Sequence, residues 1–490
     1  MEFNALIRAH LDRKASVKTA NASIRSTRKN DPFIFAVNFC EINEESDGSF
    51  QIKANITETA ANHIANSQEQ LRKENRKRID RNDALDFEGE TDNGIKVSAK
   101  ILGACFSIIR NNEGVKHELS ADLYEIEFSQ DQCAERSQHN TYLIYPIKSR
   151  PLPCETRVDL PPKCSKILMP NWAGNNTHVT RSEHDVAAFR DNTNQIIATK
   201  TASLDEAQKL RHDIDACFSF LLGQMHESVG LIHIDGSREV FIPLPASSHA
   251  IIYAQPIRCP GPHYEPMCIA FWDAFSKIRR TLESLGPEDA KDLRRAINKP
   301  LHLPAGGLFE LRVMLLAIAV EALANSVIPE DLETYVPPEG IQQVIDFISR
   351  LPVHKKTINR ATGSLNQLLK PGATNALKSF TSRMKLGESF TDRWRVVRGK
   401  LTHGKGLDYE NIDEVMRDYD QILMLHNSII LSSAGYTGPI ANHIGAGDNG
   451  NLLLSDQGIN AVTTDPLKDL ETLHYEKTLT GRFSPKNTGG

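Results

Sequence analysis

Residues 308–326 read LFELRVMLLAIAVEALANS, and their apolar side chains recur on nearly every face of a helix. The polar exceptions are Glu310, Arg312, Glu321 and Asn325. A helix that is apolar almost all round belongs in the core of a bundle or in a subunit interface, and a carboxylate on it needs a partner. We therefore expect a helical bundle around this segment. Glu321 is expected either to pair with Arg398 or to reach solvent at the end of the helix.

The chain on both sides of this segment is helical by pattern, from residue 266 to residue 434. Apolar residues recur there at helical spacing, and short loops without strand signals join the segments. The further predicted helices are 267–285, 287–297, 341–351, 363–369, 373–384, 390–401 and 412–432. Several amphipathic helices joined by short loops predict a bundle domain at 266–434.

The first 150 residues carry strand signals instead. Short β-branched and aromatic runs bounded by Gly, Asn and Asp are typical of an antiparallel sandwich or barrel. A segment without Gly or Pro at 58–83 predicts a helix inserted between two strands. Its basic half, RKENRKRIDR at 72–81, is interpreted as a solvated face in preference to a second contact for a polyanion. The predicted fold class is α+β, with a β-rich N-terminal domain at 1–150 followed by an all-α bundle.

Two further regions complete the predicted organisation. Residues 151–265 form a Pro-rich connector, with a helix that Ser203 caps and a hairpin at 230–244 around an Asp-Gly pair. Residues 435–490 are rich in Gly and Asn, and we expect a mobile or loosely docked tail there.

Composition narrows the class of protein. Hydrophobic residues make up 40% of the 490 residues and charged residues 24%, which excludes a wholly disordered, collagen-like or membrane-embedded chain. The net charge of −5 excludes a uniformly basic nucleic-acid coat. Residues 1–14 lack the apolar core of a secretory signal and no apolar run approaches the roughly 20 residues that cross a bilayer, so we expect a cytoplasmic protein without membrane contact. Eight scattered cysteines form no Cys-x-x-Cys pair, and no metal or cofactor is expected.

The stretch FTDRWRVVRGKLTHGKG at 390–406 carries the candidate chemistry. Arg398 and His403 are five positions apart, about 140° beyond a full turn, so a regular helix places them on different faces. A helix that ends between them, as Gly404 suggests, lets them converge. His can exchange a proton near neutral pH and Arg can hold phosphate oxygens, which suits cleavage of RNA through its own 2′-hydroxyl. The alternative is a surface Arg beside a His that interacts with the helix dipole.

Charge supports the first interpretation. Residues 355–405 contain twelve Lys or Arg and two acidic residues, a local charge of +10 in an acidic chain. Such a concentration is the electrostatic footprint of a polyanion partner, although a solvated face remains an alternative for 355–385. The residues expected to guide RNA are Arg393, Arg395, Lys400 and Lys405.

The apolar helix ending VEALANS, followed by WRVVRGKLTHG and a further long helix, resembles the HEPN family (higher eukaryotes and prokaryotes nucleotide-binding domain). The family signature is an Arg, four to six residues and then a His, and Arg398 and His403 match it. The resemblance implies a helical bundle that forms a homodimer, with two Arg/His pairs facing one cleft. For active members it also implies a metal-independent ribonuclease that leaves a 2′,3′-cyclic phosphate.

His403 is expected to be the general base or acid and Arg398 the phosphate stabiliser, with Glu321 and Thr402 in support. The layout is similar to that of ApeA-type anti-phage abortive-infection proteins, which implies an N-terminal sensor with a phage-derived trigger. Gly399 departs from the polar residue that follows the Arg in many active members. Two alternatives therefore stay open: a catalytically silent bundle for RNA binding or dimerisation, and a nucleotide-binding or nucleotide-transfer site.

Overall fold

The chain forms two compact units, each described by itself. The first comprises Met1–Pro151, Thr156–His212 and Glu227–Ser247, and the second Leu152–Glu155, Asp213–His226 and Ser248–Gly490. The computed structural model describes residues 2–26, 33–37, 40–74, 85–111, 114–131, 140–146, 156–157, 177–179, 186–190, 194–245, 255–257, 265–301, 309–326, 338–351, 353–367, 372–404, 406–407, 409–443, 451–455 and 458–461.

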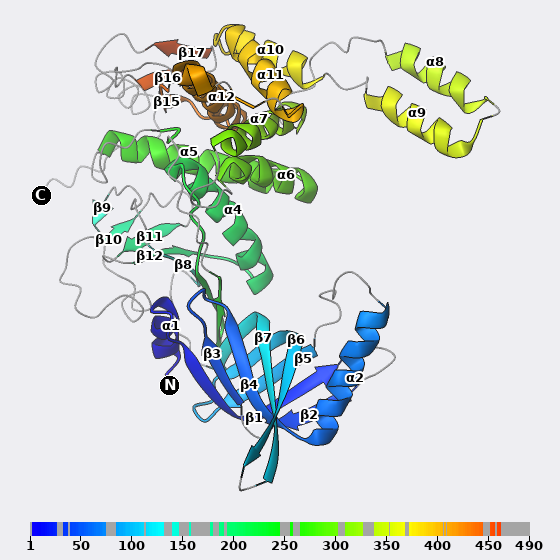
Figure 1. The fold of residues 1–490 in the computed structure, drawn as a ribbon. Coiled ribbons are helices and arrows are strands. Elements are labelled where there is room, and N and C mark those ends of the chain that lie inside the picture. The colour runs from blue at the N-terminus through cyan, green and yellow to red at the C-terminus, as the bar shows by residue number, and fades with distance from the viewer. Residues whose placement is uncertain are drawn as a thin grey trace, which may run out of the picture. The chain divides into compact units, whose positions relative to one another are not determined.

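The first unit is built on an antiparallel sheet in which six strands close into a barrel (Figure 1). The barrel strands are β1 (Ser16–Ser26), β3 (Cys40–Glu44), β4 (Phe50–Ile56), β5 (Leu85–Thr91), β6 (Lys96–Asn111) and β7 (Gly114–Asp131). Strand β4 closes the ring because it pairs with β3 on one side and with β7 on the other. Burial along β4 alternates from Phe50 to Ile56, so one face of the strand lines the core.

Three elements accompany the barrel. Strand β2 (Phe33–Val37) pairs with β1 outside the ring. Helix α1 (Phe3–Leu11) buries Leu6 and Ile7 in the same hydrophobic core. Helix α2 (Glu58–Glu74) follows β4 and confirms the inserted helix as far as Glu74; the rest of the basic segment lies outside the described residues.

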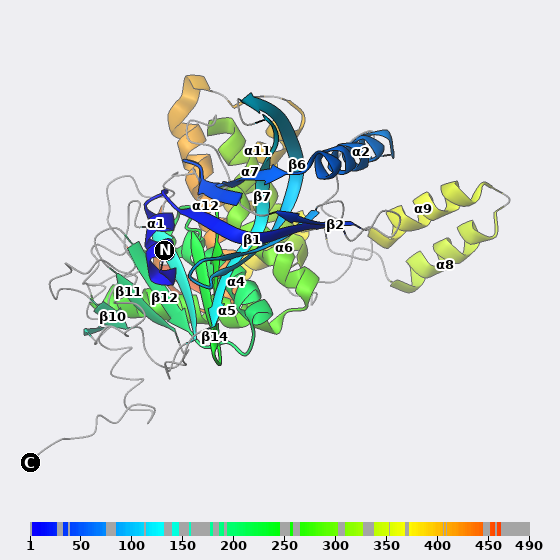
Figure 2. The same cartoon turned by 90° about the horizontal axis from the view of Figure 1, so that it is seen from below.

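The sheet continues beyond the barrel because β7 also pairs with β14. The added strands are β8 (Thr141–Pro146), β9 (Thr156–Arg157), β10 (Thr177–Val179), β11 (Ala187–Arg190), β12 (Asn194–Thr199), β13 (Gly230–Asp235) and β14 (Arg238–Pro243). Figure 2 shows β10, β11 and β12 side by side, and β13–β14 is the predicted hairpin. Strands of the expected connector thus belong to the first unit's sheet. Buried pairs such as Ile196 with Ile144 hold them there.

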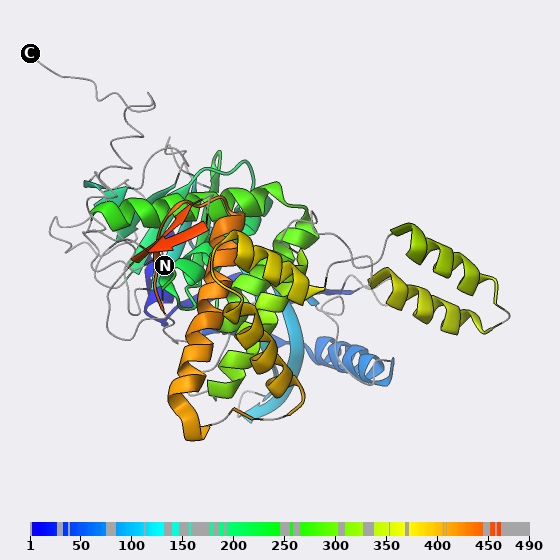
Figure 3. The ribbon, with the colours of Figure 1, turned by 90° about the horizontal axis from the view of Figure 1, so that it is seen from above.

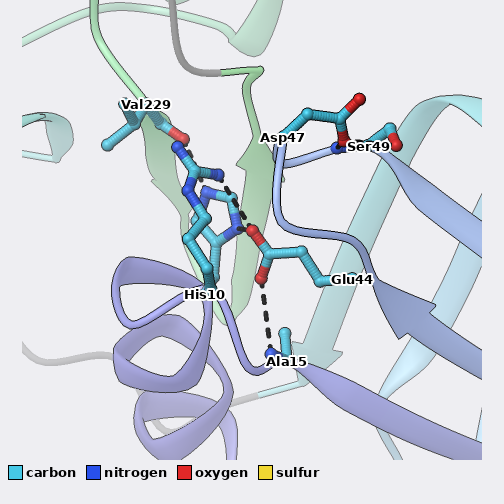
Figure 4. A network of polar contacts seen from close by, with 7 residues as sticks. His10, Ala15, Glu44, Asp47, Ser49 and Val229 are labelled. Carbon is cyan, nitrogen blue, oxygen red and sulfur yellow. Dashed lines mark hydrogen bonds and ion pairs between the residues drawn. The ribbon is translucent and has the colours of Figure 1, made fainter.

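A buried polar network ties α1 to this sheet (Figure 4). The His10 ring is fully buried, with Nδ1 3.0 Å from Glu44 Oε1 and Nε2 2.8 Å from the carbonyl oxygen of Val229. Both ring nitrogens thus face oxygen atoms of the chain. Arg13 donates to the same Glu44 oxygen at 2.9 Å. The buried Glu44 carboxylate is therefore paired with the Arg13 guanidinium, and its other oxygen accepts the N–H of Ala15, as a charge in a core requires.

Helix α4 (Leu204–Leu222) runs from the first unit into the second. Its N-terminus confirms the predicted cap, since the Glu206 N–H donates to Ser203 Oγ at 3.2 Å. The Glu206 carboxylate in turn accepts the N–H of Ala202. This reciprocal arrangement satisfies two donors at the start of the helix.

The second unit is a bundle of helices around α7 (Phe309–Ser326). The other helices are α5 (Glu265–Ser284), α6 (Pro287–Asn298), α8 (Pro338–Ser349), α9 (Lys355–Gln367), α10 (Ala373–Arg383), α11 (Ser389–Thr402) and α12 (Ile412–Ser433), with single turns η3 (Lys299–Leu301) and η4 (Tyr409–Asn411). Helix α7 contacts α6, α10, α11 and α12, and Figure 3 shows α11 and α12 beside it. The apolar helix is thus at the core of the bundle, and the predicted α+β fold class is confirmed.

Two segments of this unit differ from the prediction. Helix α9 begins at Lys355, well before the expected start at Gly363, because Gly363 faces open space and one glycine in an exposed helix costs only about 1 kcal/mol. The expected tail contains a three-stranded antiparallel sheet of β15 (Gly438–Ala441), β16 (Asn451–Ser455) and β17 (Gly458–Ala461). The N–H of Ile459 donates to the carbonyl of Met384 at 2.9 Å, which docks this sheet on the bundle. Residues 462–490 lie outside the described residues.

None of the helices in the described ranges combines the length and the apolar character that crossing a bilayer requires.

Candidate functional site

Helix α11 presents the Arg/His pair, and its inward face explains its position. Phe390, Trp394 and Val397 are buried at helical spacing against the bundle. The helix ends at Thr402, and His403 is its C-terminal cap residue. Gly404 follows with φ +69°, a left-handed conformation that glycine adopts without strain. The helix therefore ends between Arg398 and His403, as the sequence predicted.

Arg398 is held by Glu321 of α7. Its Nε donates to Glu321 Oε2 at 3.0 Å and its Nη2 donates to Oε1 at 2.7 Å, a bidentate pair. The Arg398 side chain is 40% exposed and that of Glu321 29%. Pairing, rather than escape to solvent, is thus the arrangement that Glu321 adopts. Two of the five guanidinium N–H donors are used, and the Nη1 edge makes no hydrogen bond within the described residues.

Two further contacts fix the surroundings of this pair. The indole Nε1 of Trp394 donates to the carbonyl of Ala317 at 2.9 Å, inside the bundle. The carboxylate of Glu310, in the first turn of α7, accepts the N–H of Leu407 at 2.9 Å. Glu310 therefore anchors the loop that follows His403. Sequence reasoning named Glu310 only as a polar exception, because a contact across 97 residues leaves no local pattern.

His403 and Thr402 lie at the exposed end of α11. The imidazole of His403 makes no hydrogen bond or ion pair in the part of the chain that is described, and nothing there joins it to Arg398. Thr402 Oγ1 donates to the carbonyl of Arg398 at 2.8 Å, so its proton is used within the helix. The site thus offers an accessible imidazole and a partly accessible guanidinium on one helix end.

The cations around the site are largely paired. Arg393 lies 2.7 Å from Glu414 and 3.3 Å from Asp418, both on α12, and Arg395 lies 3.3 Å from Asp392. The hydrogen bond and charge of Arg393 lower the pKa of Glu414. The pKa of Asp418 is raised, because burial outweighs the attraction of Arg393. The local charge is therefore less positive than a count along the sequence suggests.

Lys400 and Lys405 complete the predicted set. Lys400 is exposed and forms no ion pair among the described residues. Its charge nevertheless acts on α12, where it helps to lower the pKa of Glu414. Lys405 lies outside the described residues.

Comparisons with known protein families, with curated proteins and with solved structures find no match to this chain.

Proposed function

We propose that this protein is a metal-independent endoribonuclease of the HEPN type, an anti-phage defence or toxin effector whose N-terminal unit senses a phage-derived trigger. One observation carries the proposal: Glu321 orients Arg398 while the Nη1 edge makes no hydrogen bond within the described residues, and His403 is exposed at the end of the same helix. An oriented guanidinium and an accessible imidazole are the groups that transfer within RNA requires.

The proposed reaction uses only groups of the chain, the substrate and water. His403 Nε2 or Nδ1 takes the proton of the ribose 2′-hydroxyl, and the 2′-oxygen attacks the adjacent phosphorus. Arg398 Nη1 donates to the non-bridging oxygens as their negative charge grows. The bond from phosphorus to the 5′-oxygen breaks, and that oxygen takes a proton from a protonated imidazole or from water, which balances the proton removed from the 2′-hydroxyl. The products are a 2′,3′-cyclic phosphate and a 5′-hydroxyl end.

A homodimer through the bundle belongs to the same proposal. Val396 on α11 is 44% exposed, and Ile412 and Met416 on α12 are 47% and 40% exposed. Ile412 and Met416 are four residues apart and share one face of their helix. Large apolar side chains exposed on the two helices beside the site support a second copy as their partner.

The test is cleavage of total RNA and of defined tRNAs by the whole chain in excess EDTA. We expect products with 2′,3′-cyclic phosphate ends, and a loss of at least about 100-fold in rate for His403→Ala and for Arg398→Ala. The matched controls are His354→Ala and Arg417→Ala, which alter an exposed His just before α9 and an exposed Arg on α12. Full activity in both site variants would show that the site is wrong.

A second candidate function is a catalytically silent bundle that binds RNA or dimerises. The separation of the two site groups favours it, because no contact among the described residues joins His403 to Arg398, and cleavage requires both groups at one phosphate. Gel-shift titration of the same RNAs separates the two functions. Binding without any cleavage, unchanged in His403→Ala, supports the silent bundle.

A further inference from the structure

A cavity of about 430 Å³ lies in the second unit, within the size range of small-molecule sites. Its lining comes from α5, α6, α7, α10, α12 and β16. The apolar part of the wall includes Leu285, Leu293, Met384 and Leu454. None of the residues of the Arg398/His403 site lines it, so its ligand is a separate question.

Four helices end at this cavity. Thr281 and Leu285 lie at the end of α5, Ser326 ends α7, Arg383 ends α10 and Ser433 ends α12. Each helix C-terminus carries a partial negative charge of about half an electron, whereas only α6 begins here with the opposite sign. The helix ends together make the wall electronegative, and they favour a cation.

The formal charges of the lining do not reverse this preference. Asp289, in the first turn of α6, is exposed and has no ion pair among the described residues. Arg383 is the opposing charge, and its guanidinium lies 5.7 Å from the centre of the Phe380 ring. These two side chains cancel in formal charge, so the helix ends decide the sign of the field.

The hydroxyl groups of the lining point to the same class of ligand. Thr281 donates its proton to the carbonyl of Lys277, Ser326 to that of Ala322, and Ser455 to that of Gly458. Tyr436 donates to the carbonyl of Pro439, and Ser432 donates to Met384 Sδ. A hydroxyl whose single proton is already used can only accept a further hydrogen bond. These five hydroxyl groups therefore offer acceptors, which match an ammonium group, and Arg383 is the charged donor that opposes them in the lining.

We propose that this cavity binds a small amphipathic organic cation, a primary alkylammonium. Its ammonium group donates to the hydroxyl oxygens and to Asp289, and its hydrocarbon part packs on Leu285, Leu293 and Leu454. The proposed binding of an ammonium does not depend on RNA cleavage, so its test is separate from that of the proposed nuclease.

The test is calorimetric titration of the full-length protein with three probes of matched shape: cyclohexylammonium, cyclohexanol and cyclohexanecarboxylate. We expect the ammonium to bind at least tenfold more tightly than the alcohol, with no saturable binding of the carboxylate. Asp289→Asn should weaken the binding of the ammonium about tenfold, and Arg383→Met should strengthen it. Asp292→Asn, on the same helix but outside the lining, is the control and should leave it unchanged.

Thermal unfolding of each variant checks that the fold is retained, and Ser433→Leu, which adds bulk at the wall, is an independent variant. Binding of the ammonium that survives both Ser433→Leu and Asp289→Asn would overturn the proposal. So would tighter binding of the carboxylate than of the ammonium.

Discussion

Arg398 of α11 and Glu321 of α7 share two hydrogen bonds, Nε to Oε2 at 3.0 Å and Nη2 to Oε1 at 2.7 Å. The planar fork of an arginine matches a carboxylate in this way, and a lysine can supply only a point charge. The pair therefore sets the direction of the guanidinium as well as its position, which is what the proposed reaction needs from it.

Arg398→Lys keeps the charge but removes the fork. We expect the rate of RNA cleavage to fall at least about tenfold, close to the effect of Arg398→Ala, because an ammonium cannot hold Glu321 and a phosphate in one plane. Stability should change by no more than about 1 kcal/mol, because the pair is partly exposed. Initial rates and urea unfolding measure the two effects, with Arg417→Lys as the control. A fully active lysine variant would contradict the orienting role.

Trp394→Phe removes one buried donor while keeping most of the aromatic ring. The carbonyl of Ala317 then loses the indole partner, and we expect a loss of about 1–2 kcal/mol in the free energy of unfolding. Urea denaturation followed by circular dichroism measures this loss. A change below about 0.5 kcal/mol would show that the indole hydrogen bond contributes little.

Asp420→Asn tests a carboxyl group on α12. Burial raises the pKa of Asp420 from 3.8 to about 6, so the folded chain keeps a proton that the unfolded chain releases between these values. The destabilisation that results from burying this carboxyl group in its ionised form is absent below about pH 3.8 and complete above about pH 6. We expect Asn to stabilise the protein at pH 7.5 by up to about 1–2 kcal/mol after allowance for solvent screening, with the gain fading towards pH 4. Denaturant midpoints across pH 4–8 measure this gain, and a pH-independent gain would contradict the assignment.

Met416→Glu places a charge on the exposed apolar face of α12. If this face joins two copies of the chain, the carboxylate is buried without a partner and the dimer dissociates. Size-exclusion chromatography with light scattering gives the mass of wild type and variant. Val344→Glu on α8, also exposed, is the matched control and should leave the mass unchanged. A dimer that tolerates Met416→Glu would place the interface elsewhere.

The helices of the second unit follow from local patterns. The spacing of Phe390, Trp394 and Val397 predicts α11, and the apolar composition of α7 predicts its central position. Even the partner of Glu321 is among the expected alternatives, because a carboxylate on an apolar helix requires a cation. These features depend on residues close together in sequence or on one strong physical requirement.

The remaining features depend on contacts between distant residues. The barrel closes because β4 pairs with β7, and the sequence of neither strand predicts that the other is its partner. The carboxylates that neutralise Arg393 come from the following helix, so a charge count along 355–405 omits them. The small sheet β15–β17 is built from strands of four or five residues among glycines, too short to give a periodic signal. The cavity is formed by helix ends that share no motif.

The carbonyl of Ala317 also accepts the amide of Glu321, as the i to i−4 pattern of an α-helix requires. Trp394 thus donates to the turn of α7 that positions Glu321. Arg398, one turn further along α11, donates to the carboxylate of Glu321. The two contacts lie one turn apart on α11, so they fix its register along α7 together. A slip of α11 by one turn, about 5.4 Å, would disengage both at once and leave a buried indole donor without an acceptor. Any signal that reaches this helix end must therefore move α7 and α11 together.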